Sequence, residues 1–206
     1  MNCNYLIAKI SLILIFQFLV KGVLWGQNNQ FLYSMVDTTS VLTKYGYSDN
    51  HKMVVPYDKY LFNYTDTIKT IGFVLKRKEG IVAINAKGIE LFKVFTFDNG
   101  PDYVSEGLFR IVGKYQKMGF ANMKGQVIIK PAYDAAYPFV DGRALVCKGC
   151  SILQNGEHSS WSGGKWGVIN KKGNRIVPII YDSIVVSSKG INGFTKSNGK
   201  WLQKNL

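Results

Sequence analysis

The residues of this chain that are best suited to chemistry lie in one stretch, 147–161. It holds a Cys-x-x-Cys pair, Cys147 and Cys150, followed by His158 and Trp161. In an exported protein such a pair favours a local disulfide, because the compartment is oxidising. A metal site would leave a fourth ligand unnamed, and a redox dithiol would lack the βαβ context of thioredoxin-like motifs. We predict the disulfide, with a metal site, a redox pair and two free thiols as alternatives.

Catalytic signatures are missing from the sequence. It has no Gly-rich phosphate loop, no His-Glu-x-x-His and no Gly-x-Ser-x-Gly motif, and its only histidines are His51 and His158. We therefore predict that the protein is not an enzyme and has no catalytic residues, no cofactor and no metal. Three aromatic side chains, Trp161, Tyr103 and Tyr137, are candidates for stacking on a sugar if they are exposed.

The N-terminus has the pattern of a secretory signal. Lys9 is the only charge ahead of an apolar run, 10–20, and a small residue, Gly26, precedes a polar stretch. The run has the length of a signal-peptide core and is short for a membrane span. We predict a signal peptide over 1–26 and a lead-in over 27–40, so that the mature protein is periplasmic, outer-surface or secreted. If the segment is not cleaved, it becomes a membrane anchor.

Composition favours strands joined by tight turns. The 206 residues include 21 Gly, 12 Phe and 12 Tyr, and 47% are apolar, which excludes general disorder. The net charge of +13 comes from 26 Lys and Arg against 13 Asp and Glu. Because the lysines are spread over turns, and because exported proteins rarely meet nucleic acid, we predict no nucleic-acid partner.

An internal repeat organises the chain after residue 40. The stretches 80–88, 117–125 and 165–173 each end in Asn-x-Lys-Gly, and the last opens with Lys-Trp-Gly. Each stretch continues through an apolar run into an aromatic–Asp pair and then a glycine-led apolar run. The aromatic–Asp pairs are Phe97-Asp98, Tyr133-Asp134 and Tyr181-Asp182, with Tyr57-Asp58 in a weaker first copy. We expect these aspartates to accept backbone hydrogen bonds in Asx-type turns and not to bind a cation.

The Trp-Gly opening, the Asn-x-x-Gly turn and the Tyr-Asp pair together resemble the WG-repeat family, also called KWG repeats. The resemblance covers 41–206, with units at 44–79, 80–116, 117–164, 165–199 and a partial unit at 200–206. One step between copies is longer than the others, which predicts an insertion at 147–163. The resemblance implies β-hairpin repeats that act as binding or structural modules, and it brings no catalytic residues.

The fold class that follows is all-β. Three short strands per unit cannot bury a core alone, so neighbouring units must pack together. We predict an open, solenoid-like array, with a blade-like or closed arrangement as the alternative. Structural anchors recur at fixed repeat positions, and a large aromatic there is expected to be core. The predicted anchors are Tyr45, Trp166, Gly167, Trp201, Tyr133, Asp134, Tyr181 and Asp182.

The function predicted is non-catalytic binding or scaffolding at the cell envelope. Residues of the repeats are constrained by packing, whereas an inserted loop is free to carry contacts. We therefore expect the loop to hold the ligand contacts, with His158 and Trp161 as candidates. The partner is an unidentified protein or envelope glycan, the membrane is a partner only if the signal is retained, and the oligomeric state is open. The alternatives are a carbohydrate-binding module and a small redox or metal site at Cys147 and Cys150.

Overall fold

The computed structural model describes residues 31–155, 158–187, 190–197 and 200–205. The chain divides into a unit of residues 1–30 and a unit of residues 31–206, and the second contains the described residues. The predicted signal peptide and the first four residues of the lead-in, 27–30, therefore lie outside the described residues. Within the described part, no helix is long and apolar enough to cross a membrane.

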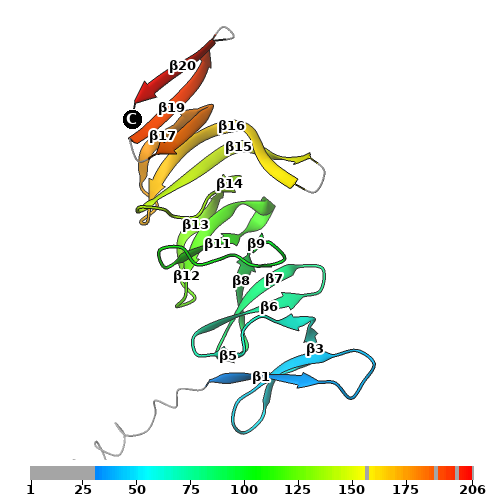
Figure 1. Cartoon of the computed structure of the whole chain (residues 1–206). Coiled ribbons are helices and arrows are strands. Elements are labelled where there is room, and N and C mark those ends of the chain that lie inside the picture. The colour runs from blue at the N-terminus through cyan, green and yellow to red at the C-terminus, as the bar shows by residue number, and fades with distance from the viewer. Residues whose placement is uncertain (1–30, 156–157, 188–189, 198–199, 206) are drawn as a thin grey trace, which may run out of the picture. The chain divides into compact units, whose positions relative to one another are not determined.

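The described chain is all-β, as predicted: apart from one 3-10 turn, its regular elements are strands (Figure 1). The first half contains β1 (Leu32–Asp37), β2 (Lys44–Ser48), β3 (Met53–Tyr60), β4 (Phe62–Asn63), β5 (Thr67–Ile68), β6 (Ile71–Lys76), β7 (Gly80–Asn85), β8 (Glu90–Val94), β9 (Thr96–Phe97) and β10 (Gly100–Pro101). The second half contains β11 (Leu108–Val112), the 3-10 turn η1 (Lys114–Gln116), β12 (Met118–Asn122), β13 (Val127–Tyr133), β14 (Ala135–Ala136), β15 (Arg143–Asn155), β16 (His158–Asn170), β17 (Arg175–Tyr181), β18 (Ser183–Ser187), β19 (Gly190–Ser197) and β20 (Lys200–Asn205).

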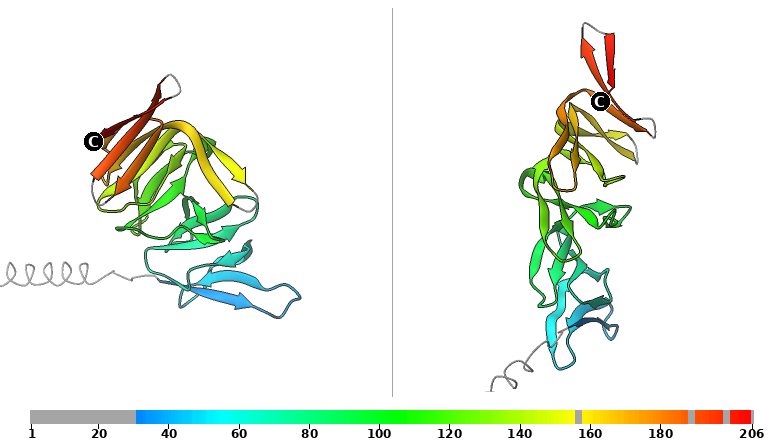
Figure 2. Two further views of the ribbon diagram at one scale, coloured as in Figure 1. Left: turned by 45° about the horizontal axis from the view of Figure 1, so that its top comes forward. Right: turned by 90° about the vertical axis from the view of Figure 1, so that its left-hand side faces the viewer.

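The sheets are antiparallel and small, and most pairings join strands that are neighbours along the chain. The strand orders are β3-β2-β1-β5, β10-β9, β13-β12-β11-β8-β7-β6-β4, β14-β15-β16-β17 and β18-β19-β20. Figure 2 shows the same succession of colours from two further sides. Among the described strands, none of the first sheet pairs with one of the last, which agrees with the open form of the predicted array.

The sheets are out of phase with the units drawn from the sequence. The glycine-led runs that close those units become β11 and β15, and each pairs with the repeat strand that follows it, β12 or β16. The third strand, β13 or β17, then pairs on the other side. The consecutive strands β11-β12-β13, and likewise β15-β16-β17, therefore span a boundary between two sequence units, because a tight connection favours pairing of consecutive strands.

The central strand of a sheet is buried on both faces. In β7, Val82 and Ile84 belong to a cluster with β1, β2 and β3, while Ile81 and Ala83 belong to a cluster with β8 and β11. Since successive side chains of a strand point to opposite faces, one strand supplies two cores. This explains why the repeat strands read as continuous apolar runs without alternation.

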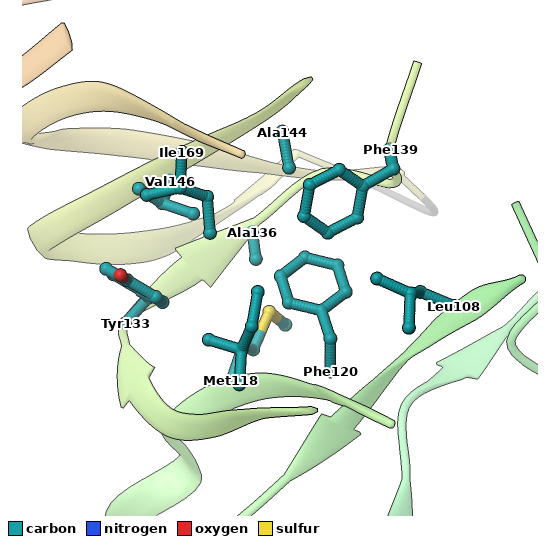
Figure 3. Packing of buried hydrophobic residues seen from close by; sticks show 10 residues of the cluster. Leu108, Met118, Phe120, Tyr133, Ala136, Phe139, Ala144, Val146 and Ile169 are labelled. Atoms are coloured by element: carbon teal, nitrogen blue, oxygen red, sulfur yellow. The ribbon is translucent and has the colours of Figure 1, made fainter. Parts of the chain in front are cut away.

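Aromatic packing fills the cluster that joins the third and fourth sheets. Phe120 from β12 meets Phe139, which precedes β15, edge to face at 4.7 Å between ring centroids. Met118, Val146 and Ile169 enclose the pair from β12, β15 and β16 (Figure 3). Both phenylalanines are fully buried. The core is therefore shared between successive sheets, as expected of stacked repeats.

The repeat glycine is required by a bulge in the next strand. Opposite Gly119, the pairing jumps from Met118↔Tyr133 to Phe120↔Ile129, and a Cβ on Gly119 would lie 2.6 Å from the backbone nitrogen of Pro131 and closer still to the carbonyl oxygen of Ile129. Gly167 lies under the equivalent bulge, between Trp166↔Tyr181 and Val168↔Val177. A side chain at these positions would collide with main chain, which has no freedom to move aside.

The three Asn-x-Lys-Gly turns share one geometry. The side-chain oxygen of Asn170 accepts hydrogen bonds from the backbone N–H groups of Lys172 and Asn174, both at 3.0 Å. Asn85 and Asn122 accept bonds from the same two relative positions. The closing glycines, Gly88, Gly125 and Gly173, all have positive φ. The Asn and the Gly are thus turn-forming residues, as the sequence pattern indicates.

A buried ion pair lies within the third sheet. Arg110 of β11 donates from Nε and Nη2 to the carboxylate oxygens of Asp102 at 2.9 and 2.6 Å, and both residues are buried. The guanidinium also lies over the ring of Phe95, 4.2 Å from its centroid. A bidentate, hydrogen-bonded pair of this kind satisfies both charges locally and holds the segment before β11 against the sheet.

Candidate functional site

The insertion is an extension of a repeat hairpin and not the surface loop expected from the sequence. Strands β15 and β16 each run for 13 residues and pair from Arg143↔Asn170 as far as Asn155↔His158. The inserted residues therefore pair with one another, which satisfies their backbone groups without any partner from the repeats. We call β15 and β16 together the extended hairpin.

A disulfide lies where the extended hairpin leaves the repeat. Cys147, which is fully buried, is bonded to Cys150 on the same strand, with 6.1 Å between their Cα atoms. Gly149, Gly163 and Gly164 have positive φ around it. A Cβ on Gly164 would lie 2.5 Å from the backbone nitrogen of Cys150. The disulfide and the glycines together fix the twist at the base of the hairpin.

A cleft of about 330 Å³ lies beside this twist. Three aromatic side chains and three polar ones, together with two aliphatic side chains and a glycine, make up its wall. The lining residues are Tyr137, Leu145, Trp161, Ser162, Gly163, Trp166, Asp182, Ser183 and Ile184; we call it the hairpin cleft. The segment before β15, both strands of the hairpin and the chain that leads into β18 all contribute. The cleft thus exists only where the insertion meets the repeat.

Two of the aromatic rings lie close together. The centroids of Tyr137 and Trp166 are 5.9 Å apart and the rings are tilted by 40°. Trp166 is only partly buried, and Trp161 packs with one part against the core cluster of Phe120 and Phe139. Each tryptophan is therefore held by the fold while part of its surface remains accessible from the cleft, as is typical of aromatic residues in ligand sites.

The aspartates of the aromatic–Asp pairs form ion pairs across the sheet. Lys165 Nζ lies 2.6 Å from Asp182 Oδ1, and Lys117 makes the same pair with Asp134. Gly80 replaces this lysine in the second copy, where Asp98 is an exposed turn residue. The lysine that opens the repeat lies opposite the aspartate on the neighbouring strand in both cases. The expected Asx-type turn is wrong for Asp134, because its backbone hydrogen bond comes from Gly149, which is 15 residues further along the chain.

Asp134 also connects the repeat to the extended hairpin. Its Oδ2 accepts a hydrogen bond from the backbone N–H of Gly149 at 2.7 Å. Burial alone would raise the pKa of this carboxyl, but the hydrogen bonds from Lys117 and Gly149 outweigh burial and hold the pKa below its ordinary value. Asp134 therefore stays ionised and keeps the base of the hairpin in place.

The predicted anchors divide into enclosed and accessible residues. Tyr133, Tyr181 and Gly167 are buried. Tyr45 is partly buried and meets Phe62 edge to face at 5.1 Å. Trp166 differs from the expectation of an enclosed core residue, because it lines the hairpin cleft. The side chains of His158 and Trp201 are outside the described part of the structure.

The candidate aromatics that the sequence singled out do not all come together. Tyr137 and Trp161 line the cleft, whereas Tyr103 is exposed and packs against Phe97, 5.5 Å away between ring centroids. Ser183 and Ile184 were not foreseen in the site. Their position directly after the Tyr181-Asp182 pair is a signal that the sequence does carry, since the pair fixes where the chain turns toward the cleft.

A metal centre finds no support in the described side chains. Among them, no three His, Cys, Asp or Glu residues are placed to hold an ion. The sulfurs of Cys147 and Cys150 are bonded to each other, so neither is a thiolate ligand in this structure.

Fold and repeats together define an all-β repeat protein. The family described as WG containing repeat matches residues 118–149 and 166–201. The first range begins with β12, and the second begins with the last five residues of β16. The chain therefore contains WG repeats, as its motifs indicate. The matched ranges include the base of the extended hairpin and leave out residues 150–165, its projecting part.

Other comparisons add little. No curated protein matches the chain. Among solved structures, "Structure of apo AztD from Citrobacter koseri" is similar over 86% of this chain at 12% sequence identity and a TM-score of 0.27. The aligned part spans 58% of the length of that chain. A likeness this distant carries no argument about function.

Proposed function

We propose that the protein is a non-catalytic binding module of the cell envelope and that the extended hairpin and the hairpin cleft form its binding surface. The observation that carries the proposal is the placement of Tyr137, Trp161 and Trp166 around one cleft beside an insertion that the repeat does not need. A concave site with several aromatics and a few polar groups is the usual form of a ligand site.

The repeats support this role as a rigid frame. Their buried apolar side chains form the cores between sheets, and the Asn, Lys and Asp side chains of the repeat motif are used in turns and ion pairs. The residues that define the repeat are therefore occupied by the fold. The extended hairpin satisfies its own backbone, is fixed at its base by a disulfide, and so holds exposed side chains in a defined position at small entropic cost.

Export is part of the proposal and rests on the sequence alone. Cleavage after Gly26 would leave a mature protein that begins at Gln27 and has a net charge of 13 − 2 = +11, since Lys9 and Lys21 are removed. N-terminal sequencing of the protein recovered from the producing cells tests it. A soluble cytoplasmic product that retains Met1 would contradict the proposal.

Affinity capture tests the binding role. The mature protein, immobilised through its C-terminus, is incubated with a solubilised envelope fraction in parallel with the double variant Trp161→Ala, Trp166→Ala and the control Tyr103→Ala. We expect one component retained by the wild type and by the Tyr103 variant and lost from the double variant. Equal retention by all three proteins would contradict a binding surface at the cleft.

A further inference from the structure

We infer that the hairpin cleft binds a saccharide ring. The inference rests on the proposed function and gives it a ligand class. A pyranose has two kinds of surface: C–H faces that pack on aromatic rings and an equatorial belt of hydroxyl groups that needs donors and acceptors. The cleft offers both kinds together.

The apolar half of the cleft suits the faces of a sugar. Trp161, Trp166 and Tyr137 come from two successive segments of the chain, and two of the rings are 5.9 Å apart and tilted by 40° instead of being stacked on each other. Rings arranged in this way present faces and edges to a common space. The volume of about 330 Å³ is at the small end of ligand sites, which fits one ring with its neighbours extending outward.

The polar half suits the hydroxyl groups. Ser162 and Ser183 each have a hydroxyl that donates and accepts. The Asp182 carboxylate lines the cleft and accepts, and it is paired with the ammonium of Lys165, a residue outside the lining, at 2.6 Å. A sugar hydroxyl can donate to this carboxylate while a neighbouring hydroxyl bonds to one of the serines. Charge-assisted bonds of this kind give orientation to a neutral ligand.

An alkylammonium ligand, the other common guest of an aromatic site, fits less well. Its binding depends on ring faces and an available negative charge. Asp182 already has Lys165 beside it, and the chain as a whole carries a net charge of +13. Both features disfavour a cation and leave a neutral or acidic saccharide as the favoured guest.

A panel of immobilised saccharides tests the inference with the full mature protein. Neutral members are chitohexaose, cellohexaose and mannan, and acidic members are polygalacturonate and heparin. We expect binding to at least one member, with affinity lowered tenfold or more in Trp161→Ala and in Trp166→Ala. Trp166→Phe should retain most of the affinity because a ring face remains, and Tyr103→Ala should match the wild type. Thermal unfolding checks that each variant is folded.

Two outcomes would overturn the inference. One is the absence of binding to every member of the panel. The other is binding to the acidic members alone that disappears with added salt and is unchanged in the tryptophan variants, since this would be the basic surface acting without the cleft. If either outcome occurs while envelope capture still depends on Trp161 and Trp166, the binding role survives and only the saccharide is excluded.

Discussion

The residue that precedes the repeat glycine is Met118 in β12 and Trp166 in β16, and the two have different surroundings. Met118 is 3% exposed and belongs to the core cluster that Ala136 and Phe139 complete. Trp166 lines the hairpin cleft together with Ser183 and Ile184. One repeat position is thus part of the core where two alanines follow the Tyr-Asp pair, and part of the wall of a cleft where Ser183 and Ile184 follow it.

The largest loss of stability is expected from replacing the residue before the repeat glycine, Met118 or Trp166, by alanine. Met118→Ala removes an enclosed side chain and should cost about 2–5 kcal/mol of unfolding free energy. Trp166→Ala removes a larger but partly accessible side chain and should cost no more than about 2 kcal/mol, less than an enclosed aromatic would. Urea unfolding measures both. A greater loss for Trp166→Ala would show that this position is core in both sheets.

The repeat glycines should follow next. Gly119→Ala forces a Cβ against the main chain of β13, so we expect a loss of about 3 kcal/mol, the upper end for overpacking. Gly107→Ala is the control, because its φ is +81° but no atom lies within 4 Å of the added Cβ. Only backbone strain remains there, worth about 1–2 kcal/mol. Equal losses in thermal or urea unfolding would mean that the bulge can move aside.

Removing the disulfide should have a smaller effect. The bond closes a very short ring, so by the chain-entropy relation Cys147→Ala with Cys150→Ala should cost at most about 2 kcal/mol and leave the repeats folded. Alanine is chosen because Cys147 is buried and serine would bury a hydroxyl there. Urea unfolding measures the loss.

The state of the two cysteines needs its own measurement. Peptide mapping under non-reducing conditions should recover Cys147 and Cys150 in one linked peptide. Two alkylatable thiols in protein taken directly from cells would contradict the disulfide. Zinc retained after dialysis would favour the metal alternative.

The smallest effect concerns acid. The pKa of Asp134 is lower in the folded protein than its ordinary value of about 4, so its contribution is present above that pH and is lost as pH falls through the folded pKa. Lys117→Met should therefore flatten the loss of stability below about pH 4, by under about 1 kcal/mol because the pair is partly exposed. Urea unfolding at a series of pH values measures this dependence. As the control, Lys130→Met, at an exposed lysine of the same sheet, should lose stability with falling pH as the wild type does.

The sequence predicts those features of the fold that depend on residues close together in the chain. The Asn-x-Lys-Gly turns, the all-β class and the extra length between Val146 and Lys165 are visible because turn chemistry and spacing act over a few residues. The ion pair between Lys165 and Asp182 was not, since it joins residues 17 apart across two strands. The sequence predicts a loop where the extended hairpin lies, because the glycines and serines of the insertion have low strand propensity.

The cleft itself could not be found from the sequence. Trp161 and Trp166 are five apart on one strand, which in a regular strand places them on opposite faces. The positive φ values of Gly163 and Gly164 between them change that relation. Whether two such glycines twist a strand or end it depends on the partner strand, which the sequence does not specify.

The double burial of the central strands sets how this protein can change over time. Alternate residues of β7 pack in different cores, so a substitution at Val82 changes the packing of one core and a substitution at Ala83 changes the packing of the other. Removing or inserting one such strand would disrupt the packing of the core on each of its two faces. Lengthening by duplication is therefore restricted to whole units, while new sequence is tolerated where a hairpin projects beyond both cores. We therefore expect whole units to be duplicated and new residues to be inserted in hairpin tips outside the cores.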